Sequence, residues 1–126
     1  MEEYPRMRER PATRVYVKGT DWGLESALAR TLAHALGQSA EIRIGNPEGE
    51  IGGDIVVTTD AASTPTDVSD MTEKGEHVVV LAALPNDAAE AGYRHAGARA
   101  YLPMVVAAAP LVAAVGGLLT SLGEAL

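Results

Sequence analysis

Apolar and polar positions recur along this chain with two different periods, and together they predict an alternation of strands and helices. Short runs rich in valine and isoleucine, bounded by glycine or polar residues, are typical of strands. Five such strands are predicted, at residues 14–18, 41–44, 54–59, 77–82 and 98–102. The third and fourth runs are continuously apolar at their centres, which indicates strands buried on both faces of a sheet.

Leucine and alanine recur at helical spacing in the segments between these strands. Three helices are predicted, at residues 24–36, 86–96 and 110–122. Gly37 and Gly97 are typical C-terminal caps for the first two helices. The side chain of Asn86 or Asp87 can accept hydrogen bonds from the first free amides of the second helix, and Pro110 is tolerated in the first turn of the third.

The order of these elements predicts a single α/β domain with a parallel sheet covered by helices on both faces. In such sheets the functional crevice lies at the carboxyl ends of the strands. The domain is expected to span residues 14–126. Residues 1–13 are charged, contain two prolines and have no apolar core, so a flexible tail is predicted there rather than a signal peptide.

Composition and charge exclude several classes of function. The formal net charge is −7 and there is no phenylalanine and only one tryptophan, so direct binding of nucleic acid is not expected. The absence of cysteine excludes disulfides and thiolate metal sites, and it agrees with a cytoplasmic location. Residues 100–123 carry no charge, but prolines and glycines interrupt them, so a packed strand and helix is predicted there rather than a membrane span.

Three stretches carry a resemblance to a known family. They read "RVYVKGTDWGLESALARTLAHAL" at 14–36, "HVVVLAALPNDAAEAGYRHAGARAYLPM" at 77–104 and "APLVAAVGGLL" at 109–119. In pattern and order these stretches resemble a response-regulator receiver (CheY-like) domain, and the branch that carries LuxR-type DNA-binding domains is the most similar. The resemblance covers residues 14–122 and implies a flavodoxin-like fold and a role in signal transduction or transcription regulation.

The chain departs from that family in the connections between its strands. Only residues 45–53 link the second and third strands, which is too short for the usual second helix. Residues 60–75 are polar, so the third helix is predicted to be reduced to a loop with at most one helical turn, near 68–73. One side of the sheet is therefore expected to be thinly covered, unless this loop or a partner packs over it.

The residues that a receiver uses for phosphoryl transfer are also replaced. The family has two metal-binding acids after the first strand, an acceptor aspartate after the third, a serine or threonine after the fourth and a lysine after the fifth. The corresponding positions here are Gly19, Thr20, Thr59, Ala82 and Met104. The resemblance therefore implies a pseudo-receiver that is not phosphorylated on aspartate, is not an enzyme and needs no cofactor.

Two acids lie one residue beyond the family positions, at Asp21 and Asp60. A slipped acidic site built from them is one interpretation, although a shift of one residue along a strand moves a side chain to the other face. The alternative is that Asp21 lies at the start of a helix and Asp60 in a turn. The histidines, His34, His77 and His95, lie on three different predicted elements, so no metal site is predicted.

The last predicted helix has an unusual outer face. A surface helix normally carries charge on that face, whereas this one carries alanine, glycine, threonine and serine. We expect a homodimer through this helix, with an interface formed by Leu111, Ala113, Ala114, Gly117, Leu118 and Ser121.

Two functions follow from these observations. The first is a signalling module that works without phosphorylation, by dimerisation or by binding a protein partner or a small ligand. The alternative is a small flavodoxin-like enzyme or ligand carrier with a pocket at the carboxyl ends of the strands.

Overall fold

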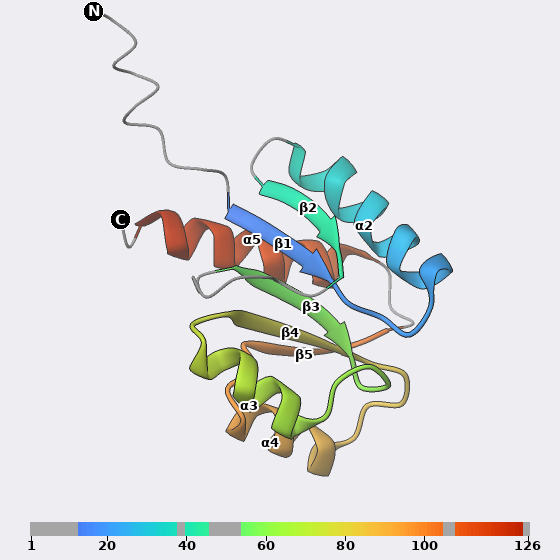
Figure 1. The fold of residues 1–126 in the computed structure, drawn as a ribbon, viewed down its shortest axis with the longest axis vertical. Helices are drawn as coiled ribbons and strands as arrows, with labels where there is room; N and C mark the ends of the chain where they lie inside the picture. The colour runs from blue at the N-terminus through green and yellow to red at the C-terminus, as the bar shows by residue number, and fades with distance from the viewer. Residues whose placement is uncertain (1–12, 38–39, 46–53, 105–107, 125–126) are drawn as a thin grey trace, which may run out of the picture.

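The computed structural model describes residues 13–37, 40–45, 54–104 and 108–124, which form a three-layer α/β fold around one sheet (Figure 1). The strands are β1 (Thr13–Val17), β2 (Ala40–Ile44), β3 (Ile55–Thr59), β4 (His77–Ala82) and β5 (Ala100–Pro103). All neighbouring strands pair in parallel, in the order β2-β1-β3-β4-β5. The predicted flavodoxin-like sheet of five parallel strands is confirmed.

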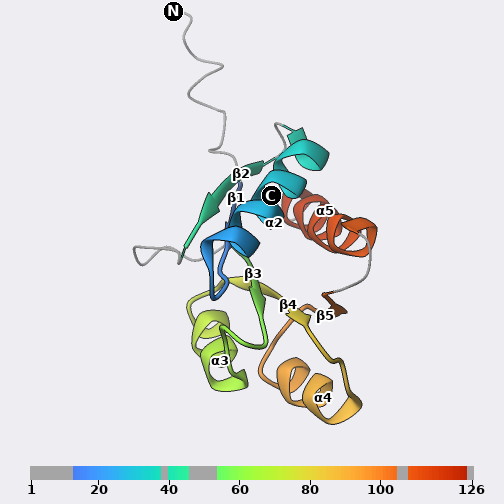
Figure 2. The ribbon, with the colours of Figure 1, turned by 90° about the vertical axis from the view of Figure 1, so that its right-hand side faces the viewer.

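Four helices lie on the two faces of this sheet. They are α2 (Trp22–Leu36), α3 (Pro65–Glu73), α4 (Asp87–His95) and α5 (Ala108–Glu124). Figure 2 shows α2 and α5 on one side of the sheet and α3 and α4 on the other. None of these described helices is both long enough and apolar enough to cross a membrane.

Each face of the sheet has its own hydrophobic core. On one face, side chains such as Val57 and Val79 pack with Leu32 of α2 and Val115 of α5. On the other face, alternate residues of the same strands pack with α3 and α4, and this second cluster includes Val56, Val78, Val80, Val68, Met71 and Tyr93. Because β3 and β4 are covered on both faces, every residue of β3 is buried, which explains the continuous apolar run.

The strand β2 is apolar on only one face, whereas β1 also has the buried Tyr16 on its other face. Val15 and Ile42 point toward α2 and α5, whereas Arg14, Glu41 and Arg43 point to the other side of the sheet. Glu41 and Arg43 are exposed and form an ion pair with each other. No described helix lies over this face of β2, and its exposed Glu41 and Arg43 are suited to water rather than to a covering helix.

The helix α3 is longer than the single turn predicted for residues 60–75. It has nine residues. Thr64 and Asp67 form a capping box that stabilises its first turn. The Asp67 N–H donates to Thr64 Oγ1 at 3.1 Å, and the Thr64 N–H donates to Asp67 Oδ2 at 2.9 Å. Val68 and Met71, nearly one turn apart, are buried against the sheet. The helix is still short beside α2, which has fifteen residues.

Other predicted boundaries need small corrections. The helix α5 begins at Ala108 rather than at Pro110. The strand β5 begins at Ala100 rather than at residue 98, because the Ala98 N–H donates to the Tyr93 carbonyl as α4 ends. Gly37 does cap α2, with a φ of 60°. The predicted tail lies outside the described residues, except for Thr13, which opens β1.

Candidate functional site

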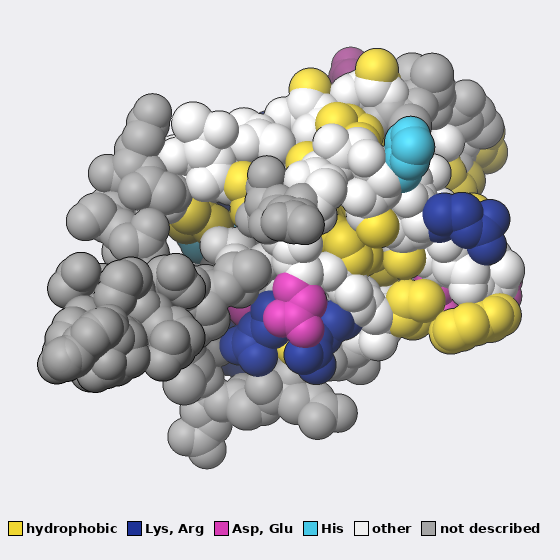
Figure 3. All heavy atoms as spheres, turned by 90° about the horizontal axis from the view of Figure 1, so that it is seen from above, with side chains coloured by type: hydrophobic (Ala, Val, Ile, Leu, Met, Phe, Trp, Pro, Cys, Tyr) yellow, Lys and Arg dark blue, Asp and Glu magenta, His cyan; other side chains and the backbone are white. Residues whose placement is uncertain are grey.

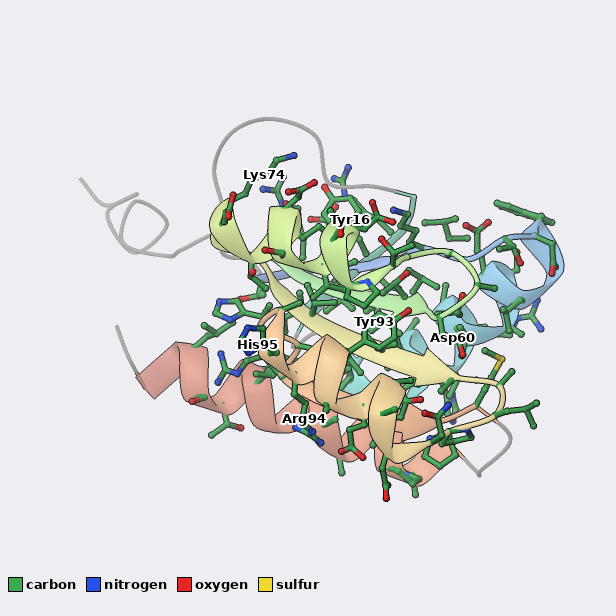
Figure 4. All side chains as sticks on the ribbon, turned by 90° about the horizontal axis from the view of Figure 1, so that it is seen from below. Tyr16, Asp60, Lys74, Tyr93, Arg94 and His95 are labelled. Carbon is green, nitrogen blue, oxygen red and sulfur yellow. The ribbon has the colours of Figure 1, made fainter. Side chains whose placement is uncertain are left out.

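The parallel strands bring the predicted site residues to one edge of the sheet, where β1, β3, β4 and β5 end. Figure 4 shows Asp60 at this carboxyl edge, with Tyr93 of α4 facing the same side of the sheet. The hydrogen bonds of the residues at this edge determine what the edge can bind.

At the end of β1, two carboxylates bind backbone amides. Asp21 is the N-cap of α2, and its Oδ1 accepts from the Leu24 N–H at 2.9 Å. Glu25 Oε2 accepts from the Gly19 N–H at 2.9 Å. A Cβ at position 19 would lie 3.0 Å from Glu25 Cγ, so the bare backbone of Gly19 leaves room for this contact. Thr20, which lies between Gly19 and Asp21 in the sequence, is exposed.

At the end of β3, the hydroxyl groups are buried and paired. Thr59 is 1% exposed, and its Oγ1 accepts from the Ala62 N–H at 3.1 Å. The hydroxyls of Thr58 and Ser63 lie 2.7 Å apart, and both residues are buried. Asp60 follows in a turn and is partly exposed, and its N–H donates to the Leu81 carbonyl at 3.0 Å.

The ends of β4 and β5 present no charged group. Ala82 is completely buried. Met104 is half-buried and packs against the core beneath α5, and its N–H donates to the Ala82 carbonyl at 2.8 Å. The resemblance aligns Met104 with the lysine of the family, and the side chain here is a thioether.

Tyr93 joins α4 to the loop after β3. Its hydroxyl donates to the Ser63 carbonyl at 2.6 Å, and its ring stacks on Tyr101 with the centroids 5.8 Å apart. Burial raises the pKa of the Tyr93 hydroxyl, and the negative charge of Asp60 raises it further. The hydroxyl is therefore held in the protonated, donating form.

Sequence reasoning missed Glu25 and Tyr93 at this edge. The position of Glu25 in the first turn of a helix was an available signal, because acids are favoured there. Tyr93 gave no comparable signal, since its partner Ser63 is thirty residues away in the sequence.

The two acids of the slipped site have different surroundings. Asp21 is engaged as a helix cap, and Asp60 lies in the turn after β3. Among the residues that the structure describes, no three acidic or histidine side chains come together in a way that would hold a metal ion. His34, His77 and His95 lie on α2, β4 and α4, and Figure 4 shows His95 at the end of α4 away from Asp60.

The proposed dimer residues of α5 fall into two groups. Leu111 and Leu118 are buried in the chain's own core, so they do not belong to the outer face and are removed from the predicted interface. Ala113, Gly117 and Ser121 are exposed on that face, and Ala114 is half-buried beside them.

Comparisons with known sequences and with solved structures differ in outcome. No model of a known protein family matches the chain, and no curated protein matches it either. Solved structures do match it in fold.

Three of these structures illustrate the likeness. A two-component response regulator of the LuxR family from Aurantimonas sp. is 13% identical, with a TM-score of 0.71 over 88% of this chain and 87% of that one. A protein from Burkholderia thailandensis assigned to pilus assembly (CpaE) is 16% identical, with a TM-score of 0.74 over 86% and 98% of the two chains. A response regulator from Burkholderia pseudomallei that carries a phosphorylated aspartic acid is 14% identical, with a TM-score of 0.67 over 89% and 71%. At these identities the likeness shows that the chain has the receiver fold.

Proposed function

We propose that this chain is a receiver-like signalling domain that acts without phosphorylation of an aspartate, through contacts with other proteins. The observation that carries the proposal is the position of Thr59. It stands where the resembled family has its phosphate acceptor, it is 1% exposed, and its hydroxyl is bonded to the Ala62 N–H. An alcohol in this state offers no carboxylate for an acyl phosphate.

The remaining residues at the carboxyl edge support the same proposal. Phosphoryl transfer needs cations that offset the charge of the transferred group. Met104 supplies no positive charge. One oxygen of each carboxylate, Asp21 Oδ1 and Glu25 Oε2, accepts a hydrogen bond from a backbone amide, which competes with Mg²⁺ for these oxygens. In this proposal the domain has no enzymatic activity and works in the cytoplasm, as one part of signal transduction or transcription regulation.

The partner surface in this proposal is the outer face of α5. Ala113, Gly117 and Ser121 are exposed there, and small residues allow a second helix to approach closely. A second copy of the chain is the partner that we propose for this face.

The alternative function, a small enzyme or ligand carrier with a pocket at the carboxyl edge, has less support. It needs free polar groups at that edge to recognise a substrate. Thr58, Ser63 and Tyr93 form hydrogen bonds with one another there, and Thr58 and Ser63 are buried.

The decisive experiment is incubation with acetyl phosphate, and separately with beryllofluoride, in the presence of Mg²⁺. Intact mass spectrometry and amide NMR spectra then report any adduct. We expect an unchanged mass and an unchanged spectrum. The Burkholderia pseudomallei regulator with the phosphorylated aspartic acid is a suitable positive control. A stoichiometric phosphoryl adduct, or a spectral change at Asp60 and its neighbours, would contradict the proposal.

A further inference from the structure

A groove lies between α2 and α5, on the face of the molecule opposite α3 and α4. Its volume is about 540 Å³, and it is lined by Arg30, Thr31, His34, Ala35 and Val112. Small-molecule sites in proteins have volumes of about 300–1,000 Å³. The groove therefore has the size of a ligand site, and it is formed by the second half of α2 rather than by the carboxyl edge.

The groove has an apolar surface and a cationic rim. The methyl groups of Ala35 and Val112 contribute to the apolar surface. Arg30 and His34 are exposed and lie one helical turn apart, so both side chains reach the same side of α2. A molecule in the groove would meet methyl groups along its body and a guanidinium and an imidazole at one end.

Arg30 differs from the other arginines that the structure describes. Each of the others donates to a side-chain acceptor: Arg14 to Asp54, Arg43 to Glu41, Arg94 to Glu90 and Arg99 to His77. Within the described part of the chain, Arg30 has no such acceptor. Its planar donors are therefore available to an anion, which a guanidinium binds through two parallel hydrogen bonds.

The charge around the groove also favours an anion. The chain has a net charge of −7, yet α2 has no acid after Glu25. The first turn of α5 also has no acid, so no carboxylate there compensates the positive end of its helix dipole. Figure 3 shows mainly white and yellow atoms over α2, with few acidic side chains. An anion repelled by most of this acidic surface would be attracted here.

We propose that the groove binds a small amphipathic anion, a molecule with an apolar body and one carboxylate or phosphate head. Arg30 holds the head through its paired N–H donors, and His34 supplies a second donor. Ala35 and Val112 contact the apolar body. This site is independent of the proposed function, because it uses neither the carboxyl edge nor the outer residues of α5.

The test is a titration of the full chain with octanoate, followed by amide and methyl NMR. We expect shifts that are largest at the five lining residues and that saturate. Arg30→Gln should weaken binding about tenfold or more, because a charge-assisted pair is lost. The matched control is Arg94→Gln on α4, which should bind octanoate like the unmodified chain. Octanol, which has the same body and no charge, should bind more weakly than octanoate.

A second variant fills the groove itself. Ala35 is exposed, so Ala35→Phe should leave the fold intact, as circular dichroism would show, while it abolishes the octanoate shifts. Equal losses in Arg30→Gln and Arg94→Gln, equal affinity for octanol, or an absence of saturable shifts would overturn the proposal. So would groove shifts that depend on protein concentration and that octanoate does not displace, since a second copy of the chain would then be the occupant.

Discussion

Two carboxylates at the carboxyl edge accept hydrogen bonds from backbone amides, one in the loop before α2 and one in its first turn. Glu25 accepts from Gly19, and Asp21 accepts from Leu24. These bonds fix the loop that joins β1 to α2, and they occupy one oxygen of each carboxylate. At the scale of single residues, Asp21 and Glu25 therefore stabilise the fold at this edge.

The role of Asp21 leads to a first prediction. Asp21→Ala should lower the free energy of unfolding by about 1 kcal/mol, because a helix loses its N-cap. The size of the loss should be the same with and without Mg²⁺, as measured by urea denaturation. Thr20→Ala is the control, since Thr20 is exposed. A loss that grows when Mg²⁺ is present would instead indicate the slipped acidic site.

Glu76 gives a second prediction, which concerns pH. Its side chain is buried before β4, and this burial raises its pKa above the ordinary value; the nearby Asp54 raises it further, while Lys74 opposes the shift. A carboxyl whose pKa is raised by folding favours the folded state when protonated, and this contribution is lost as the pH rises through the folded-state pKa. Glu76→Gln should therefore be more stable than the unmodified chain at pH 7 by about 1 kcal/mol.

This difference should vanish at pH values below the ordinary pKa of a glutamate, where both chains are uncharged at position 76. Urea denaturation at the two pH values measures it. Glu73→Gln, at an exposed position of α3, is the matched control and should change stability little at either pH. A Glu76→Gln variant that is less stable at pH 7 would show that the carboxylate has a favourable partner.

Among the elements, α5 combines a buried face with an exposed face of small residues. Val115 is completely buried, whereas Ala113 and Gly117 are exposed. Neither the first turn nor the last turn of the helix has a charged residue that compensates its dipole. Two copies of α5 packed in antiparallel orientation would compensate each other's dipoles.

The dimer proposed for α5 gives a third prediction. Light scattering of the unmodified chain should report a mass of two copies, and Ala113→Glu or Gly117→Arg should reduce it to one. Ala91→Glu, at an exposed alanine on α4, is the matched control and should leave the dimer intact. A monomeric mass for the unmodified chain would contradict the interface.

Sequence patterns predicted the elements with strong local signals and missed those that depend on distant contacts. The apolar runs of β3 and β4 and the cap at Gly37 were sufficient to place the sheet and the end of α2. The helix α3 was underestimated, because the polar character of residues 60–75 concealed the capping box of Thr64 and Asp67. The hydrogen bond from Tyr93 to Ser63 could not be predicted, since only the fold brings them together.

Considered as a whole, the molecule separates its charges between two sides. The acids Asp67, Asp70 and Glu73 lie on α3, whereas α2 has no acid after Glu25 and α5 has none before Glu124. Because the chain has a net charge of −7, copies approaching through the α3 side would repel one another. The α2–α5 side is the one on which both proposed contacts, with a second copy and with a small anion, avoid this repulsion.

The open face of β2 also has a consequence for local unfolding. β2 is an edge strand, paired only with β1, and the described helices pack against only one of its faces. With one neighbouring strand instead of two, it has fewer backbone hydrogen bonds to lose than β3 when it detaches, and such regions open at a lower free energy than a core strand. In native-state hydrogen exchange, we expect the amides of Arg43 and Gly45, which face β1, to exchange well before those of Val57 and Val79. Equal protection of β2 and β3 would mean that the sheet opens only as one unit.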